Sequence, residues 1–236
     1  MASNNRHKAF APFIVEQADS LVALGCEVEY FGICGKGIKG YYSNLKLLKA
    51  KIKEFKPDVI HAHYGLSGLL ANMQRSVPVV TTYHGSDINV PWILRFSKMS
   101  MCLSAYNIFV SKKTLDIAAP KKKFMLLPCG VNLDEFPVIS RQDARKQLDI
   151  PLEHKFVLFA GAFDNQVKNA PLAKAAMALI PGEELKECKG YTRSQVALLM
   201  NAADAFLMTS FTEGSPQVIK EAMACGCPIV SGTLAT

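Results

Sequence analysis

Two patterns of apolar and polar positions alternate along the chain: short apolar runs, and longer segments with helical periodicity. In the first half they predict strands over 27–32, 59–63, 78–83, 107–111 and 125–128, and helices over 12–24, 43–55, 66–75, 91–103 and 112–118. In the second half they predict strands over 156–160, 184–188, 204–210 and 228–231, and helices over 169–180, 192–203 and 216–225. This alternation predicts an α/β fold whose parallel sheets carry helices on both faces.

The polar, proline-flanked segment 134–154 marks the expected connection between two domains, 1–138 and 139–236. Half of the 236 residues are apolar, which is enough for a packed core. No apolar run reaches the roughly 18 residues of a membrane span, and the N-terminus lacks the apolar core of a signal peptide. We therefore expect a cytoplasmic protein. The seven cysteines are scattered and odd in number, which favours free thiols, and no second pair joins Cys225 and Cys227 to make a zinc site.

The net charge of +7 lies entirely in the first half, which holds 17 Lys and Arg against 10 Asp and Glu up to residue 138. Much of it lies on 43–56, where apolar residues recur at helical spacing beside a stripe of lysines: Lys46, Lys49, Lys53 and Lys56. One interpretation is an ordinary surface helix. The other is contact with an anionic membrane surface, at the inner face, or with a lipid-linked acceptor. Nucleic acid is not an expected partner, because no nucleic-acid-binding module accompanies the charge.

One strand–loop–helix–strand unit near the end of the chain carries the candidate chemistry. The apolar run 204–210 predicts a buried strand, and Ser215 as N-cap with Pro216 at the first helical position predicts the start of a helix. In such units an anionic ligand binds at the carboxyl ends of the strands, beside the N-terminus of the helix. Gly214 and Ser215 lie at that point.

Two glutamates lie eight residues apart across this helix start. Glu213 is expected on the loop that faces a ligand, and Glu221 lies between one and two turns into the helix. A carboxylate in the position of Glu221 can accept hydrogen bonds from two vicinal hydroxyls, as in a ribose. A solvated helix residue is the alternative for Glu221.

The segment 213–228 resembles the Glu-x7-Glu signature of the retaining glycosyltransferases of family 4. Four other segments resemble that family in the right order: Asp-Val-Ile-His-Ala-His-Tyr-Gly at 58–65, Val-Val-Thr-Thr-Tyr-His-Gly-Ser-Asp at 79–87, Leu-Leu-Pro-Cys-Gly-Val-Asn at 126–132 and Phe-Val-Leu-Phe-Ala-Gly at 156–161. The resemblance implies the GT-B fold, in which two Rossmann-like domains face each other across a cleft. It also implies retaining transfer of a sugar from a nucleoside diphosphate sugar to an acceptor hydroxyl, in cell-surface glycan or glycolipid synthesis.

The resemblance implies that a lysine and backbone amides bind the leaving diphosphate. Lys168 stands where the family has a lysine that neutralises this diphosphate, together with the amides at Gly214 and Ser215; a solvated loop lysine is the alternative. The family's arginine after Gly161 is Ala162 here, so one of two phosphate cations is absent. No metal or other cofactor is expected, because the sequence has no Asp-x-Asp pairing.

Further roles are implied for four residues. Glu213 would orient the sugar, Glu221 the ribose, and His84 would contact the donor sugar near the reaction centre. Tyr191 would lie against the nucleotide base. A core histidine and an ordinary loop tyrosine are the alternatives for His84 and Tyr191. We expect His61 and His63 to point to opposite faces of their strand, so that at most one reaches the cleft.

Both ends depart from the family pattern. The first strand, which is central in the usual sheet order, is expected to be missing, because only about eleven polar and mixed residues precede the helix at 12–24. The glycine-rich loop after it is represented at best by 8–11, which has no glycine. The last strands of the second domain and the helix that returns to the first are also expected to be missing, which predicts an enzyme truncated at both ends.

Two other functions remain open. A nucleotide-sugar epimerase shares the GT-B architecture, but it needs acid and base groups that the sequence does not supply. A non-catalytic remnant that binds nucleotide weakly, or not at all, would fit the truncated ends and Ala162.

Overall fold

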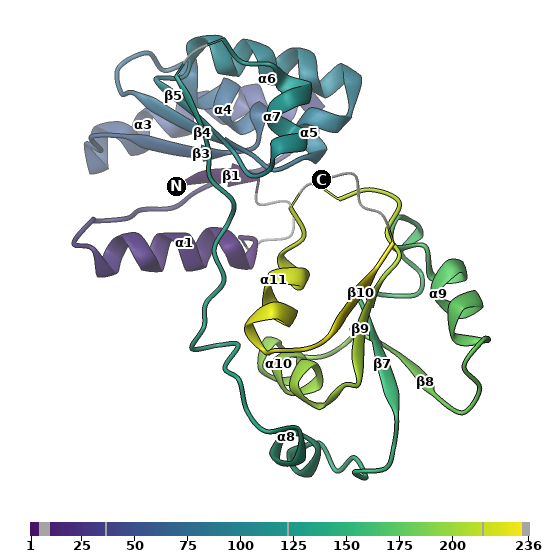
Figure 1. The fold of residues 1–236 in the computed structure, drawn as a ribbon. Helices are drawn as coiled ribbons and strands as arrows, with labels where there is room; N and C mark the ends of the chain where they lie inside the picture. Colours follow the sequence, from purple (N-terminus) through teal and green to yellow (C-terminus); the bar gives the residue numbers. More distant parts are fainter. Residues whose placement is uncertain (5–9, 36, 122, 214, 233–236) are drawn as a thin grey trace. The chain divides into compact units, whose positions relative to one another are not determined.

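A computed structural model describes residues 1–4, 10–35, 37–121, 123–213 and 215–232 (Figure 1). The chain forms two compact units, Met1–Cys129 and Gly130–Ala235, and each is an α/β unit with a parallel sheet. All seven cysteines are free thiols. Within the described ranges, no helix has the length and apolar character needed to cross a membrane.

The first unit is built on a six-stranded sheet of order β2-β1-β3-β4-β5-β6. Its strands are β1 (Ala2–Asn4), β2 (Phe31–Ile33), β3 (Ile60–His63), β4 (Val79–Tyr83), β5 (Tyr106–Phe109) and β6 (Phe124–Leu126). Its helices are α1 (Pro12–Ala23), α2 (Gly37–Ser43), α3 (Leu45–Phe55), α4 (Gly65–Asn72), α5 (Ser86–Asn89), α6 (Pro91–Leu103) and α7 (Lys112–Ala118). Helix α4 packs on one face of this sheet, with α6 beside it. Figure 1 shows α1 on the other face.

The expectation of a missing first strand is wrong. Residues Ala2–Asn4 form β1, which pairs in parallel with β2 on one side and with β3 on the other. Ala2 and Ser3 are buried, at 2% and 1% exposure. The strand lacks the apolar signature of a buried strand because it is only three residues long and uses small side chains. Residues 8 and 9 of the glycine-poor loop expected at 8–11 lie outside the described residues.

Helices α4 and α6 approach each other closely because glycine and serine residues face one another. A Cβ atom on Gly68 would lie 2.5 Å from the hydroxyl oxygen of Thr81 and would also meet the hydroxyl of Ser100. A Cβ atom on Gly65 would meet Ser97 in the same way. This close approach fixes the loop between β3 and α4 against the sheet.

The second unit is built on a four-stranded sheet of order β10-β9-β7-β8. Its strands are β7 (Phe156–Phe159), β8 (Glu184–Glu187), β9 (Ala205–Met208) and β10 (Ile229–Ser231). Its helices are α8 (Arg141–Gln147), α9 (Ala170–Met177), α10 (Arg193–Ala202) and α11 (Gln217–Ala224), with a 3-10 helix, η1, at Gln166–Lys168. A capping box begins α10: the Thr192 hydroxyl accepts a hydrogen bond from the Gln195 backbone N–H, and the Gln195 side chain accepts one from the Thr192 backbone N–H.

The segment predicted as a connection belongs to the second unit. Phe136 is 1% exposed and lies in the core of this unit, and α8 follows it. Arg145 on α8 is fully buried. The structure therefore divides the chain after Cys129, nine residues before the end of the first domain as it is predicted from the sequence.

Candidate functional site

Lys168 and Glu213 lie in direct contact in the second unit. Lys168 ends η1 in the connection after β7, and Glu213 lies in the loop after β9. The Lys168 ammonium donates to the Glu213 carboxylate across 2.7 Å, and the two side chains are 19% and 18% exposed. The structure thus brings together two of the residues singled out in the sequence, at the carboxyl ends of adjacent parallel strands, where ligands bind in open α/β sheets.

Two local features hold Lys168 in this position. Its side chain passes over Gly161, where a Cβ atom would lie 2.9 Å from Cγ of Lys168. The Thr209 hydroxyl, at the end of β9, donates to the backbone carbonyl oxygens of Lys168 and Asn169 at 2.9 and 3.0 Å. Gly161 is therefore required by the close passage of the lysine, and the backbone of η1 is tied to β9.

Glu221 is held by an arginine that the sequence analysis missed. Glu221 is 7% exposed, and its Oε1 accepts a hydrogen bond from Arg193 across 3.1 Å. The same guanidinium donates to Glu135 across 2.8 Å and lies 5.0 Å from the centre of the Phe136 ring. Glu221 is therefore not a solvated helix residue. Arg193 lies 28 residues away in the sequence, so no local pattern indicates this pair.

The environment of Cys188, just after β8, connects the two glutamate sites. Burial and then the Glu221 charge raise the pKa of its thiol to about 12, and the Lys168 charge opposes this rise. Both charges therefore act on one partly buried thiol.

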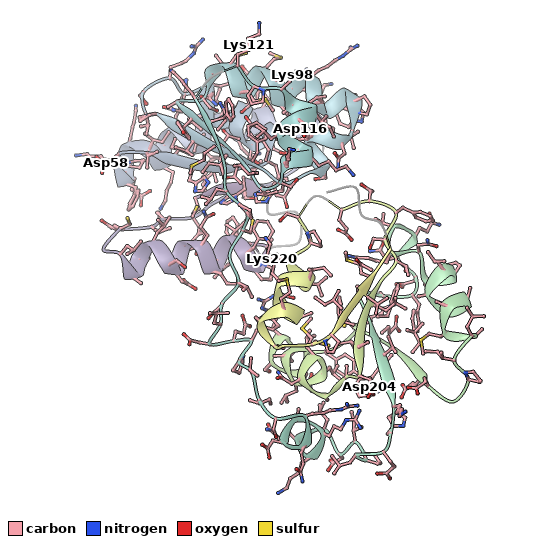
Figure 2. The ribbon with its side chains drawn as sticks, viewed as in Figure 1. Asp58, Lys98, Asp116, Lys121, Asp204 and Lys220 are labelled. Atoms are coloured by element: carbon pink, nitrogen blue, oxygen red, sulfur yellow. The ribbon has the colours of Figure 1, made fainter. Side chains whose placement is uncertain are left out.

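The start of α11 differs from its prediction. The helix begins at Gln217, with Pro216 as its N-cap and no side-chain cap, so Ser215 is not the N-cap. Pro216 is extended, with ψ near 110°, and delays the helix by one residue. The Ser215 hydroxyl instead accepts a hydrogen bond from the Lys220 ammonium across 3.0 Å. Figure 2 labels Lys220 on α11.

Two predicted site residues remain, Tyr191 and Gly214. Tyr191, directly before the N-cap of α10, is 38% exposed. Gly214 lies outside the described residues.

His84 lies in a cluster of rings in the first unit, at the end of β4. Its Nε2 is 3.1 Å from Nδ1 of His63, and its Nδ1 is 4.0 Å from the sulfur of Cys129. Phe13 and Tyr64 pack against its ring, with centroids 4.7 and 4.8 Å away. Burial, and then the nearby His61, lower the pKa of His84 to about 3, so its imidazole is neutral at neutral pH.

Asp87 anchors the loop that carries His84. Its Oδ1 accepts the backbone N–H groups of His84 and Gly85 at 3.0 and 2.9 Å, and its Oδ2 accepts that of Gly65 at 2.9 Å. Gly85 has φ of +117°, which favours glycine. Burial raises the pKa of Asp87 to about 6, although the backbone hydrogen bonds oppose this. In the sequence, Asp87 is only the last residue of the segment 79–87, and no pattern there indicates that it anchors this loop.

His61 and His63 point to the same face of β3, so the expectation of opposite faces is wrong. Successive strand residues alternate, and residues two apart therefore share a face. Their rings are stacked with centroids 4.5 Å apart. Within the parts of the chain that the structure describes, no three His, Cys, Asp or Glu side chains are arranged to hold a metal ion.

Two family models match this chain in sequence order. A model described as Glycosyltransferase Family 4 matches residues 27–135, and one described as Glycosyl transferases group 1 matches residues 182–236. A protein of Bacillus subtilis (strain 168) named for a glycosyltransferase of teichuronic acid biosynthesis, TuaC, is 27% identical over 210 residues, covering 76% of this chain and 54% of its own length. The amylovoran biosynthesis glycosyltransferase AmsK of Erwinia amylovora is 25% identical over 226 residues, covering 78% and 55%. The chain spans about half the length of these curated relatives.

Solved structures share the fold. Sucrose-phosphate synthase from Thermosynechococcus elongatus has a TM-score of 0.83 at 19% identity, covering 99% of this chain and 81% of that one. HepE of Anabaena, in complex with UDP, has a TM-score of 0.69 at 17% identity, covering 92% and 71%. The two parallel-sheet units and the likeness to these structures identify the fold of this chain as GT-B, a class of glycosyltransferase folds. The match to the Glycosyltransferase Family 4 model covers residues 27–135, so the chain is similar to that family over its first unit, and its end is similar to the glycosyl transferases of group 1.

Proposed function

We propose that this chain is part of a retaining glycosyltransferase that transfers a sugar from a nucleoside diphosphate sugar to an acceptor hydroxyl, in the synthesis of a cell-surface glycan or glycolipid. The contact between Lys168 and Glu213 at the carboxyl ends of β7 and β9 carries the proposal. Relatives named for teichuronic acid and amylovoran biosynthesis support the product class. HepE has been solved with UDP-glucose, and Starch Synthase IV with ADP, which supports the donor class.

The leaving diphosphate is the group that most needs stabilisation, because negative charge develops on it as the sugar leaves. A single preorganised hydrogen-bond donor contributes about 3–4 kcal/mol where charge develops in a transition state. Lys168 is held close to this position by its pairing with Glu213, so little reorganisation is needed when a diphosphate arrives. Backbone amides at Gly214 and Ser215 would add hydrogen bonds. No metal ion is needed for this role.

The other residues orient the donor. Arg193 pairs with the Glu221 carboxylate across 3.1 Å and positions it to accept hydrogen bonds from the ribose hydroxyls. Tyr191 is exposed enough to lie against the base. Glu213 and His84 would contact the sugar. Retention follows if a diphosphate oxygen assists the acceptor hydroxyl from the face that the leaving group vacates, so that no protein nucleophile is required.

We test the donor site by calorimetric titration of UDP, GDP and ADP, and then of the sugar conjugates of the nucleotide that binds. Glu221→Ala is expected to lower the affinity at least about tenfold, the equivalent of about 1.4 kcal/mol. Lys168→Met is expected to lower the affinity for the diphosphate much more than that for the nucleoside. The matched controls Glu153→Ala and Lys155→Met change exposed residues and should bind like the original chain.

The outcomes separate the candidate functions. Saturable binding with transfer of the sugar to an acceptor, and with an unchanged anomeric configuration by NMR, supports the proposal. An isomerised donor without transfer would indicate an epimerase. The absence of binding by all three nucleotides would indicate a non-catalytic remnant.

We also propose that the first unit contacts an anionic membrane surface, at the cytoplasmic face, through α2 and α3. Lys46, Lys49 and Lys53 are all exposed on α3. Two exposed apolar side chains lie beside them: Leu47 on α3, at 61% exposure, and Tyr42 on α2, at 62%. The three lysines line a shallow hollow of about 620 Å³. Cationic side chains beside exposed apolar ones are typical of surfaces that lie in a lipid headgroup region. An acceptor attached to a lipid would be presented there.

A further inference from the structure

We propose that His63 is a positioning residue that fixes the tautomer of His84, so that His84 presents Nδ1 as a hydrogen-bond acceptor. The proposal rests on a line of four side chains in the first unit. The sulfur of Cys129 lies 4.0 Å from His84 Nδ1, His84 Nε2 lies 3.1 Å from His63 Nδ1, and His63 Nε2 lies 3.4 Å from the sulfur of Met1.

Each neutral imidazole has one donor nitrogen and one acceptor nitrogen, so the line can run in only two directions. In the first, His63 donates from Nε2 to the Met1 sulfur, His84 donates from Nε2 to His63 Nδ1, and the Cys129 thiol donates to His84 Nδ1. Every ring nitrogen then meets a group of the opposite kind.

The reverse direction fails at Met1. His63 would donate from Nδ1 to His84, and its Nε2 would become an acceptor facing a thioether sulfur, which has no hydrogen to donate. His63 is fully buried, at 0% exposure, and an acceptor left there without a donor loses the hydrogen bond that it makes with water in the unfolded chain. The first direction is therefore favoured, and it gives His84 an Nε2–H.

The surroundings keep the imidazole rings neutral, so each ring has one donor and one acceptor nitrogen. Burial lowers the pKa of His84 to about 3 and that of His61 to about 4, and it lowers the pKa of His63 still further. The Phe13 ring packs against both His63 and His84, and His61 stacks on His63. His61 is not part of the line, because its Nε2 is bonded to the hydroxyl of Thr82 at 2.7 Å.

The consequence for the ligand rests on the proposed function. His84 Nδ1 can accept a hydrogen bond from a hydroxyl, as in a sugar, but not from a phosphate oxygen, which has no hydrogen when ionised. His84 would thus select the hydroxyl-bearing part of the donor, and the ligand hydroxyl would take the place of the Cys129 thiol.

Long-range 1H–15N spectra of the chain with 15N-labelled histidine test the proposal without any ligand. The His84 signals, identified by their loss in His84→Gln, are expected to show a protonated Nε2 and an unprotonated Nδ1, unchanged between about pH 5 and pH 8. A protonated Nδ1, or a titration of His84 within that range, would overturn the proposal.

Two substitutions at His63 give a readout that a merely structural role would not produce. His63→Phe fills the space but offers no acceptor, so we expect His84 to become a mixture of tautomers. His63→Asn carries an amide oxygen on the same number of bonds as Nδ1, and it is expected to restore the Nε2–H form. His154→Asn, on an exposed histidine of the second unit, is the matched control and should leave the His84 signals unchanged. A pure Nε2–H form in His63→Phe would count against the proposal.

The test remains decisive if His63→Phe does not fold, because the spectra of the unsubstituted chain and of His63→Asn then decide. Nucleotide titration reports on the second unit and is independent. Failure of the nucleotide to bind would contradict the proposed function and leave the tautomer of His84 established. Binding of a nucleotide together with a protonated His84 Nδ1 would support the proposed function and overturn the proposed tautomer.

Discussion

At the scale of single residues, buried polar groups hold loops and helices where sequence patterns give little guidance. Arg145 on α8 is completely buried. Its guanidinium donates to Asp204 and to the carbonyl oxygen of Ala202, each at 3.0 Å, and lies 5.7 Å from the centre of the Phe156 ring. Asp204 also accepts the backbone N–H of Phe156 at 2.9 Å, so one carboxylate ties α8 to β7 and β9 (Figure 2).

Asp204→Ala is expected to lower the free energy of unfolding by about 3–5 kcal/mol, because it leaves the Arg145 charge buried without its partner. The matched control is Asp164→Ala, which breaks the ion pair with Lys189 at 2.6 Å. Those two side chains are 69% and 54% exposed, so the loss there should stay within about 1 kcal/mol. Denaturant unfolding of both variants measures the difference. Equal losses would show that Arg145 does not depend on Asp204.

The lowered pKa values in the histidine cluster lead us to expect that acid destabilises the first unit. The pKa values of His61 and His84 are lowered to about 4 and about 3, so below about pH 6.5 the unfolded chain takes up protons that the folded chain does not. The stabilisation that comes from the neutral histidines is therefore fully present above about pH 6.5, and it is lost as the pH falls. Asp87, whose pKa is raised to about 6, takes up a proton more readily in the folded chain, so it adds stability as the pH falls. It is one group against the three histidines of the cluster, whose pKa values are lowered. We expect a loss of at least about 3 kcal/mol between pH 6.5 and pH 4.

Unfolding by denaturant across this pH range measures the effect. His61→Asn should flatten the dependence on pH, because it removes one of the groups whose pKa is lowered by folding. A stability that stays constant or rises on acidification would contradict the neutral histidine cluster.

At the scale of elements, the tight contact between α4 and α6 gives a sharp prediction. Gly68→Ala places a methyl group against the side chains of Thr81 and Ser100, and neither neighbour is a flexible chain end that can move away. We expect a loss of about 1–3 kcal/mol in the free energy of unfolding, as for other overpacked cores. Gly130→Ala is the control, because no atom lies within 4 Å of its added Cβ. Thermal unfolding of both variants is the measurement, and an unchanged Tm for Gly68→Ala would contradict the packing.

The elements also show what the sequence can and cannot predict. Strands β3 and β4 follow from apolar runs at 59–63 and 78–83, because a buried strand of four or five residues leaves a clear pattern. The three residues of β1 leave none, since Ala2 and Ser3 are buried by their neighbours in the sheet and not by their own apolar character.

The same reasoning holds for the candidate site. Lys168 and Glu213 could be singled out from a family resemblance, but their contact joins positions 45 residues apart. Arg193 and His63 act through partners that are distant in sequence, and only the folded chain brings these partners together.

At the scale of the whole molecule, charge is distributed unevenly between the two halves. Up to residue 138 the chain has 17 Lys and Arg against 10 Asp and Glu, and the remaining residues balance. A net charge alone would attract any anionic surface without orientation. The exposed Leu47 and Tyr42 beside the α3 lysines distinguish one surface from the rest of the basic unit. This leads to a prediction about where a membrane would be contacted.

The chain is expected to sediment with vesicles that contain an anionic lipid and not with purely zwitterionic ones, and added salt should weaken this binding. Neutralising Lys46, Lys49 and Lys53 together to Gln should lower the vesicle affinity on the order of a hundredfold, since each lysine near such a surface contributes about 1 kcal/mol. The control changes Lys98, Lys112 and Lys121 to Gln; all three are exposed in the same unit, on or beside α6 and α7. Figure 2 labels Lys98 and Lys121. If both triple variants lose the same affinity, net charge alone drives the binding and α3 has no special role. A larger loss for the α3 variant means that the first unit meets the membrane in one orientation, with the hollow beside Tyr42 turned towards the lipid headgroups.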